Sequence, residues 1–284
     1  MRGWWQDLTD LVLPAECGGC GRPRTVLCPE CRAALSGSAS RRVRPVPEPP
    51  GLPAVHAAAP YADEVRAILL AHKERGALAL AGPLGAALAG AVRAGLRSGL
   101  RYGPSGPGDA VARSAGGPVL LVPVPSARRA VRARGHDPAR RIALAAAGGL
   151  RRSGTPTRVV AVLRQRRAVA DQSGLNSRQR LDNLAGALEV AAGGERLLLG
   201  GAVVLVDDLM TTGASLTDAA RAVRTAVYAA APREGMGERN AGSRQKERNS
   251  VYDAPEMADA YGTGDVVCAA VVAASPDSFE INRN

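Results

Sequence analysis

The sequence has few aromatic residues, and this scarcity limits the kinds of core it can form. Of its 284 residues, only 3% are Phe, Trp or Tyr, whereas 46% are hydrophobic. The core must therefore be built from Ala, Val and Leu, which favours small helices packed on a β-sheet over an aromatic-rich sandwich. A chain of this length forms one or two domains and can bury a sizeable core.

Lysine is also nearly absent, so arginine carries the positive charge. The net charge is +11 and the pI is about 10.3, yet lysine occurs only at Lys73 and Lys246. Such charge suits a polyanionic partner such as a nucleic acid. An Arg-, Ala-, Gly- and Pro-rich composition is equally typical of a GC-rich coding sequence. Because aromatic side chains that could stack on bases are scarce, charge alone does not assign nucleic-acid binding.

The chain lacks a recognisable secretory signal and a clear membrane span. Asp7 and Asp10 interrupt the only early apolar stretch, and no small-residue cleavage site is evident. The longest uncharged run, between Arg75 and Arg93, is rich in Gly and Pro and falls short of the about 20 apolar residues of a membrane span. We therefore expect a buried helix there and a cytoplasmic protein, whose five cysteines are reduced thiols or metal ligands.

Apolar runs typical of buried strands alternate with helical periodicity along most of the chain. The expected strands are 54–59, 119–124, 158–163, 187–190, 202–206 and 265–273. The expected helices are 62–75, 77–98, 138–150 and 214–226. This alternation predicts an α/β fold with a mainly parallel sheet flanked by helices.

Changes in composition predict the domain organisation. The expected parts are a cysteine-rich metal-binding module at 1–35, a Ser/Arg/Pro linker at 36–53, the main domain at 54–227, a disordered insertion at 228–264, and the last core strand with a tail at 265–284. Within the main domain, the Gly/Pro-rich residues 101–118 are expected to form a surface loop.

The segment 203–215 carries the clearest chemical pattern. An apolar strand is followed by Asp207 and Asp208, then by a hydroxyl-rich turn and a helix. The residues of this turn are Thr211, Thr212, Gly213, Ala214 and Ser215. Free backbone N–H groups at the start of a helix, together with hydroxyl donors, suit a phosphate group. Carboxylates at the carboxyl edge of a sheet suit ribose hydroxyls or a bridging magnesium ion.

A simpler interpretation of the same segment is a helix cap after a solvated strand end. It would suffice for an isolated Thr-Thr-Gly, but it does not explain the complete order of strand, acid pair, turn and helix. Neither the GxxxxGK[ST] nor the GxGxxG pattern occurs in the sequence, which weighs against an NTPase or a dinucleotide-binding enzyme.

A basic turn follows the expected strand 119–124. It comprises Ser126, Ala127, Arg128 and Arg129. Guanidinium groups in a tight turn suit a diphosphate, although an ordinary basic surface loop is the alternative. Arg164 and Gln172, in the polar segment 164–186, are further candidate contacts.

Four cysteines form two CxxC pairs near the N-terminus. Cys17 and Cys20 are separated by seven residues from Cys28 and Cys31. Four thiolates complete a closed tetrahedral site, which predicts structural zinc. The alternative, a redox dithiol pair, requires a thioredoxin-like context that the sequence lacks. Cys268 lies in an expected strand and is interpreted as a small buried residue.

With these motifs in the order 17–31, 121–134, 172–186 and 207–215, the chain resembles the ComF family of competence-associated proteins, which carry an N-terminal double zinc ribbon and a type I phosphoribosyltransferase domain. The resemblance implies that Asp207 and Asp208 are the catalytic pair that holds the ribose hydroxyls, and that Thr211–Ser215 hold the 5-phosphate. It further implies that Ser126–Arg129 face the diphosphate, with magnesium, and that 164–186 form a mobile hood. A static helix-loop cover is the alternative for 164–186.

The chain departs from the family pattern at residues 135–137. The family has an aromatic-Asn pair where this chain has Gly135-His136-Asp137. We interpret His136 as a residue of a surface turn and not as a general base. His56 and His72 have no partner at motif spacing, and we assign them no chemistry.

Two functional hypotheses remain open at the level of sequence. The first is a transferase that binds phosphoribosyl diphosphate with magnesium and joins the sugar to an unidentified acceptor. The second is a non-catalytic adaptor that contacts single-stranded DNA or a protein of the competence machinery, with a ligand-sensing or vestigial site. Both are compatible with a homo-oligomer.

Overall fold

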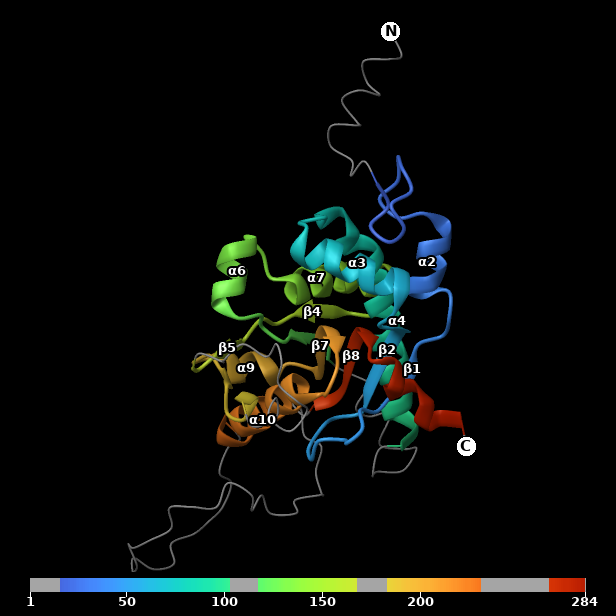
Figure 1. The fold of residues 1–284 in the computed structure, drawn as a ribbon. Coiled ribbons are helices and arrows are strands. Elements are labelled where there is room, and N and C mark those ends of the chain that lie inside the picture. Colours follow the sequence, from blue (N-terminus) through green and yellow to red (C-terminus); the bar gives the residue numbers. More distant parts are fainter. Residues whose placement is uncertain (1–15, 103–116, 168–182, 231–265, 284) are drawn as a thin grey trace, which may run out of the picture.

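The computed structural model describes residues 16–102, 117–167, 183–230 and 266–283. Within them, six strands form one sheet with helices on both faces (Figure 1). The strand order is β1-β2-β8-β7-β3-β4, and all neighbours are parallel except β1 and β2. The bounds are β1 Arg41–Val43, β2 Val55–Pro60, β3 Val119–Pro123, β4 Thr157–Val159, β7 Ala202–Met210 and β8 Val266–Ala274. The predicted α/β fold with a mostly parallel sheet is confirmed.

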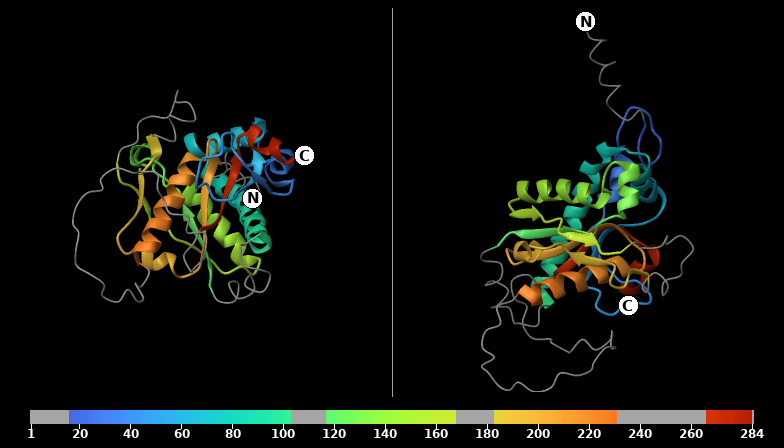
Figure 2. Two further views of the ribbon diagram at one scale, coloured as in Figure 1. Left: turned by 90° about the horizontal axis from the view of Figure 1, so that it is seen from below. Right: turned by 90° about the vertical axis from the view of Figure 1, so that its left-hand side faces the viewer.

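Both faces of the sheet are buried, because the four central strands, β2, β8, β7 and β3, each contribute to two cores. In β7, Val204 and Val206 belong to one core, and Val203 and Leu205 belong to the other, as the two-residue period of a strand requires. Figure 2 shows the two helical layers on opposite sides of the sheet. The first layer contains α2 Pro29–Ser36, α3 Asp63–Glu74, α4 Ala81–Tyr102 and α7 Pro138–Arg152, and the second contains α9 Gly194–Leu198 and α10 Ala214–Ala230.

Small residues let α4 pack closely on its neighbours. A Cβ atom on Gly85 would lie 2.5 Å from the Cβ of Ala145 in α7, and one on Gly95 would lie 2.6 Å from the Sγ of Cys268 in β8. Close approach of backbones fills the core that bulky aromatic side chains would otherwise fill. The segment Leu78–Ser98, which includes the 3-10 turn η1 Leu78–Leu80, is long and apolar enough to cross a membrane, but 56% of an apolar 18-residue stretch within it is buried inside the fold.

The expected strand 158–163 is divided between two sheets. Its first part lies in β4, whereas β5 Leu163–Gln165 pairs antiparallel with β6 Leu188–Val190 in a separate two-stranded sheet. The N–H of Val162 donates to the carbonyl of Val160 at 3.0 Å, so the chain turns away from the main sheet between these residues. The sequence could not reveal that turn, because the apolar run 159–163 continues across it without a break.

Of the two C-terminal strands, β7 is longer than its sequence indicated, and β8 has a position that its sequence did not indicate. β7 continues past the expected end at Val206 to Met210, because β8 pairs with it as far as Ala274. β8 lies between β2 and β7, in the middle of the sheet, although it is the last strand of the chain. Strand order depends on long-range pairing and is not written in the local pattern.

Part of the segment expected to be a linker belongs to the sheet. Residues Arg41–Val43 form the edge strand β1, and Val43 is buried. Leu52 lies against Gly213 of the hydroxyl-rich turn, since a Cβ atom on that glycine would come within 3.1 Å of the leucine methyl groups. The segment 36–53 therefore contacts the predicted phosphate-binding region. The C-terminal 3-10 helix η2, Pro276–Arg283, lies beside β1.

Several expectations lie outside the described residues. They concern Gln172, most of the loop 101–118, most of the insertion 228–264 and the first 15 residues of the cysteine-rich module.

Candidate functional site

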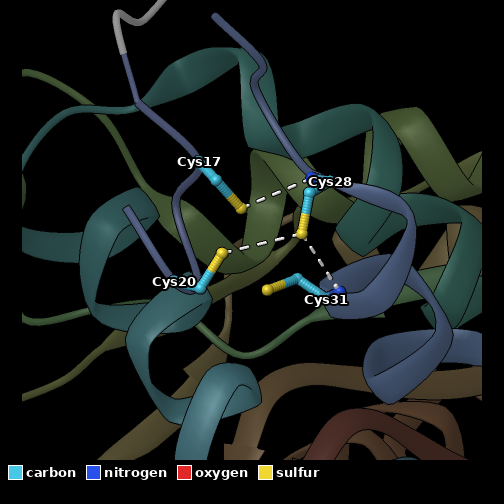
Figure 3. Close-up of side chains that lie close together, drawn as sticks. All are labelled: Cys17, Cys20, Cys28 and Cys31. Atoms are coloured by element: carbon cyan, nitrogen blue, oxygen red, sulfur yellow. Dashed lines mark hydrogen bonds between the residues drawn. The ribbon is translucent and has the colours of Figure 1, made fainter. Parts of the chain in front are cut away.

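The four predicted metal ligands come together at the start of α2. Cys17 and Cys20 lie on the preceding loop, Cys28 caps α2, and Cys31 lies in its first turn. Their sulfur atoms all lie within 4.8 Å of one another, and the side chains point toward a common centre (Figure 3). The Cys20 and Cys28 sulfurs are 3.6 Å apart. Four sulfurs at about 2.3 Å from a zinc ion would lie about 3.8 Å apart, so the arrangement fits a tetrahedral metal.

The cysteine cluster is packed into the first core of the domain. Cys17, Cys28 and Cys31 are buried, and Cys20 is exposed. Gly19 permits this packing, because a Cβ atom there would lie 2.6 Å from the Cys31 sulfur and 3.4 Å from Ile68 of α3. The cluster therefore suits a structural metal such as zinc, with all four positions taken by protein ligands.

The thiols of the cluster differ in proton affinity. Burial raises the pKa of Cys17, but backbone N–H groups, led by that of Cys20, outweigh burial and lower this pKa to about 6. Burial and the neighbouring sulfur of Cys28 raise the pKa of Cys31 above its ordinary value. Because metal ligands must be thiolates, metal binding at this cluster releases protons.

The two acids lie at the carboxyl edge of the main sheet. β3 ends opposite Val206, and the N–H of Val124 donates to the carbonyl of Val206 at 2.9 Å. Asp207 and Asp208 thus follow the last residue of β7 that pairs with β3, while β7 remains paired with β8 on its other side. Oδ1 of Asp207 accepts the N–H of Asp208 at 2.8 Å. Burial, followed by the charge of Asp208, raises the pKa of Asp207 well above its ordinary value.

Sequence reasoning missed a cation beside these acids. The ammonium of Lys73, at the end of α3, lies 3.1 Å from Oδ2 of Asp208, whose side chain is only 9% exposed. The charge of Asp208 raises the pKa of Lys73. Lys73 belongs to no motif, and the rarity of lysine was the one signal in the sequence that could have drawn attention to it.

The hydroxyl-rich turn directly joins the acid-bearing strand to α10. Gly213 has a φ of +77°, a left-handed conformation that glycine adopts without steric cost. Its carbonyl accepts the N–H of Thr217 at 2.9 Å, and Thr212 Oγ1 accepts the N–H of Ala214 at 3.5 Å. Thr211 is exposed, and Thr212 and Ser215 are half-buried. The three hydroxyl-bearing residues are therefore accessible from solvent, whereas Gly213 and Ala214 are buried.

The basic turn joins β3 to the next helix and is hydrogen-bonded to α7. Arg128 and Arg129, the last two residues of the turn, begin this next helix, α6 Arg128–Arg134. The N–H of Ser126 donates to Oδ2 of Asp137, the residue that caps α7. A pocket of about 310 Å³ lies here. Its lining includes Ser126, Arg128, Arg132 and Arg164. Arg164 also forms an ion pair with Glu189 at 2.9 Å.

The interpretation of His136 as a surface residue is wrong. His136 is only 9% exposed, and its ring packs edge-on against that of His72, with the ring centres 5.5 Å apart. Arg134 of α6 donates two hydrogen bonds to Glu74 of α3, at 3.2 and 2.8 Å, and these bonds link the two helices. His56 is also buried and lies 3.1 Å from the hydroxyl of Ser98.

The predicted site residues therefore fall into two groups. The acids lie in the last part of β7, and the hydroxyl-rich turn and the basic turn follow β7 and β3 at the same edge of the sheet. The cysteines lie against α3 in the helical layer. Lys73 of α3 reaches from that layer to the acids. No protein-family model matches this sequence, and no curated protein is similar to it.

Proposed function

We propose that the chain binds phosphoribosyl diphosphate as a type I phosphoribosyltransferase of the ComF kind and transfers the phosphoribosyl group to an acceptor. The observation that carries the proposal is the direct succession of an acid pair, an accessible hydroxyl-rich turn and the 17-residue helix α10 at the end of a central parallel strand. Open α/β sheets bind ligands at this edge.

The 5-phosphate is assigned to the turn Thr211–Ser215. The first N–H groups of α10 have no partner within the helix, and the helix dipole favours an anion in front of them. The hydroxyl groups of Thr211 and Ser215 add donors, and the left-handed Gly213 gives the turn its shape.

The ribose and the diphosphate are assigned to the two neighbouring strand ends. Asp207 and Asp208 accept hydrogen bonds from the ribose hydroxyls, and the Arg128 guanidinium at the pocket beside Ser126 pairs with diphosphate oxygens. The acids would supply carboxylate oxygens to a magnesium ion, which usually binds through one or two carboxylates and substrate phosphates. When bound, magnesium neutralises charge on the leaving diphosphate.

The transfer breaks the bond between C1 of the ribose and the diphosphate oxygen and forms a bond from C1 to the acceptor. The acceptor loses its proton, and diphosphate leaves with the bonding electrons. The contribution of this chain is to orient both reactants and to stabilise charge, since no covalent nucleophile is required.

Calorimetric titration of phosphoribosyl diphosphate with magnesium tests the proposal. Wild type is expected to bind, and Asp208→Asn is expected to bind at least about tenfold more weakly, because a neutral amide replaces a charged acceptor. Asp277→Asn, at an exposed position of η2, is the matched control and should bind like wild type. Equal binding by wild type and Asp208→Asn would defeat the proposed site.

Two further measurements separate an enzyme from an adaptor. Release of diphosphate in the presence of a panel of nucleobases identifies a transferase and its acceptor class. If phosphoribosyl diphosphate does not bind, but single-stranded DNA binds with an affinity that falls steeply with salt, the net charge of +11 serves an adaptor instead.

A further inference from the structure

Lys73 is placed beside Asp208 by a helix that is held at several points along its length. Near the middle of α3, Ile68 is fully buried against the cysteine cluster. At its end, the carboxylate of Glu74 holds Arg134 of α6. The position of the Lys73 backbone is therefore fixed by the packing of α3, and the side chain reaches Asp208 from an anchored base.

A second feature is the way in which the charges around the acids are paired. Within the described part of the chain, Lys73 is the cation that forms an ion pair with either acid of the pair. Arg134, the nearby cation that acts on Lys73, is occupied by Glu74. Asp208 is buried, and two adjacent carboxylates without a cation would repel each other strongly in such surroundings. The ammonium of Lys73 compensates the charge of the buried Asp208 carboxylate.

We propose that Lys73 is a positioning residue, a built-in counter-ion that occupies the cation position beside Asp208 until a divalent metal arrives together with its diphosphate ligand. The inference rests on the proposed function for the identity of that ligand. It explains how the Asp208 carboxylate can remain buried at the sheet edge. It also means that the free protein binds divalent metal weakly, because the metal and the ammonium compete for Asp208 Oδ2.

Binding of Mn²⁺ alone to the zinc-loaded protein tests the inference. Mn²⁺ prefers oxygen ligands and is observed directly by electron paramagnetic resonance. Lys73→Met and Lys73→Gln are expected to bind Mn²⁺ at least about tenfold more tightly than wild type, because a unit positive charge next to the acids is removed. Lys73→Arg keeps the charge and should bind as weakly as wild type.

The gain in Mn²⁺ affinity must come from the acid pair. Asp208→Asn in the Lys73→Met background should therefore abolish this gain. Unchanged Mn²⁺ affinity in both neutral variants would overturn the inference. A misfolded variant would lose metal binding and could not imitate the expected gain. If neither neutral variant folds, the rate at which Lys73 is acylated tests the inference instead. Mass spectrometry can measure this rate directly, because the chain has only two lysines. Lys73 should react several-fold faster in Asp208→Asn, where its partner has lost its charge, and equal rates would overturn the inference.

The outcome can be distinguished from that of the proposed function. A wild type that binds phosphoribosyl diphosphate while the Lys73 variants gain no Mn²⁺ affinity overturns the counter-ion role alone. A wild type that does not bind phosphoribosyl diphosphate, while Lys73→Met gains Mn²⁺ affinity, overturns the ligand assignment and leaves the counter-ion role in place.

Discussion

The carboxylate of Asp137 accepts the backbone N–H of Ser126 at 3.2 Å, and this bond ties the basic turn after β3 to the start of α7. The other carboxylate oxygen accepts the N–H of Arg140 at 3.1 Å and caps the helix. One side chain thus stabilises a helix and also sets the direction in which the turn presents its N–H groups and Arg128 to an anion.

The two roles of Asp137 can be separated by substitution. Asp137→Ala loses both bonds and is expected to cost about 1–2 kcal/mol of unfolding free energy, whereas Asp137→Asn retains a good helix cap and should cost less. Both variants should bind inorganic diphosphate more weakly than wild type. Ala offers no acceptor to the N–H of Ser126, and in Asn the NH2 group faces this N–H when the single amide oxygen caps α7. Urea unfolding and calorimetry measure the two effects. Wild-type diphosphate affinity in Asp137→Asn would show that the tether does not shape the turn.

The cysteine cluster is expected to hold one metal ion per chain and to stabilise the first core. Cys28→Ser should lose zinc and lower the unfolding free energy by several kcal/mol, because the cluster packs directly on Ile68 and Leu80. Elemental analysis and thermal unfolding provide the measurements. Cys268→Ser, in β8 and outside the cluster, is the control for metal content and should retain the zinc. Full zinc occupancy in Cys28→Ser would contradict a four-cysteine site.

Gly213 is expected to be intolerant of a side chain for two reasons, its left-handed backbone conformation and its contact with Leu52. Gly154 has a similar φ, +84° against +77°, but open space around it, so Gly154→Ala measures the cost of the backbone conformation alone. That cost is about 1 kcal/mol. Gly213→Ala should cost about 1 kcal/mol more, because the new Cβ presses on Leu52. Urea unfolding of the two variants gives the difference, and Leu52→Ala should relieve part of it. Equal costs would mean that residues 36–53 do not press on the turn.

Asp207 is expected to make stability depend on pH in a defined direction. Burial and the charge of Asp208 raise its pKa, so the folded state holds the proton more tightly than the unfolded state. This contribution is complete below the unfolded pKa of about 3.9 and is lost as the pH rises through the folded pKa. Asp207→Asn should therefore be more stable than wild type at about pH 7, and its advantage should shrink toward about pH 4. Urea unfolding across this range checks the sign, and an advantage that grows on acidification would contradict it.

Local patterns predicted most of the elements and the metal ligands. The apolar runs of β2, β3, β7 and β8 correspond to strands, since a strand buried on both faces needs no alternation. The two CxxC pairs converge because each pair fixes its own turn and α2 starts at the second pair. The acid pair and the turn that follows it are contiguous in sequence, so their succession at the end of a strand could be predicted.

The sequence by itself determined where strands, helices, the cysteine cluster and the acid-turn segment would form, because these depend on residue periodicity and short spacing. Only the tertiary structure decided the central position of β8, the burial of His136 against His72, and the contact between Lys73 and Asp208. These features join residues far apart in the chain. They depend on strand register and on how α3 packs over the sheet, and no local pattern encodes either.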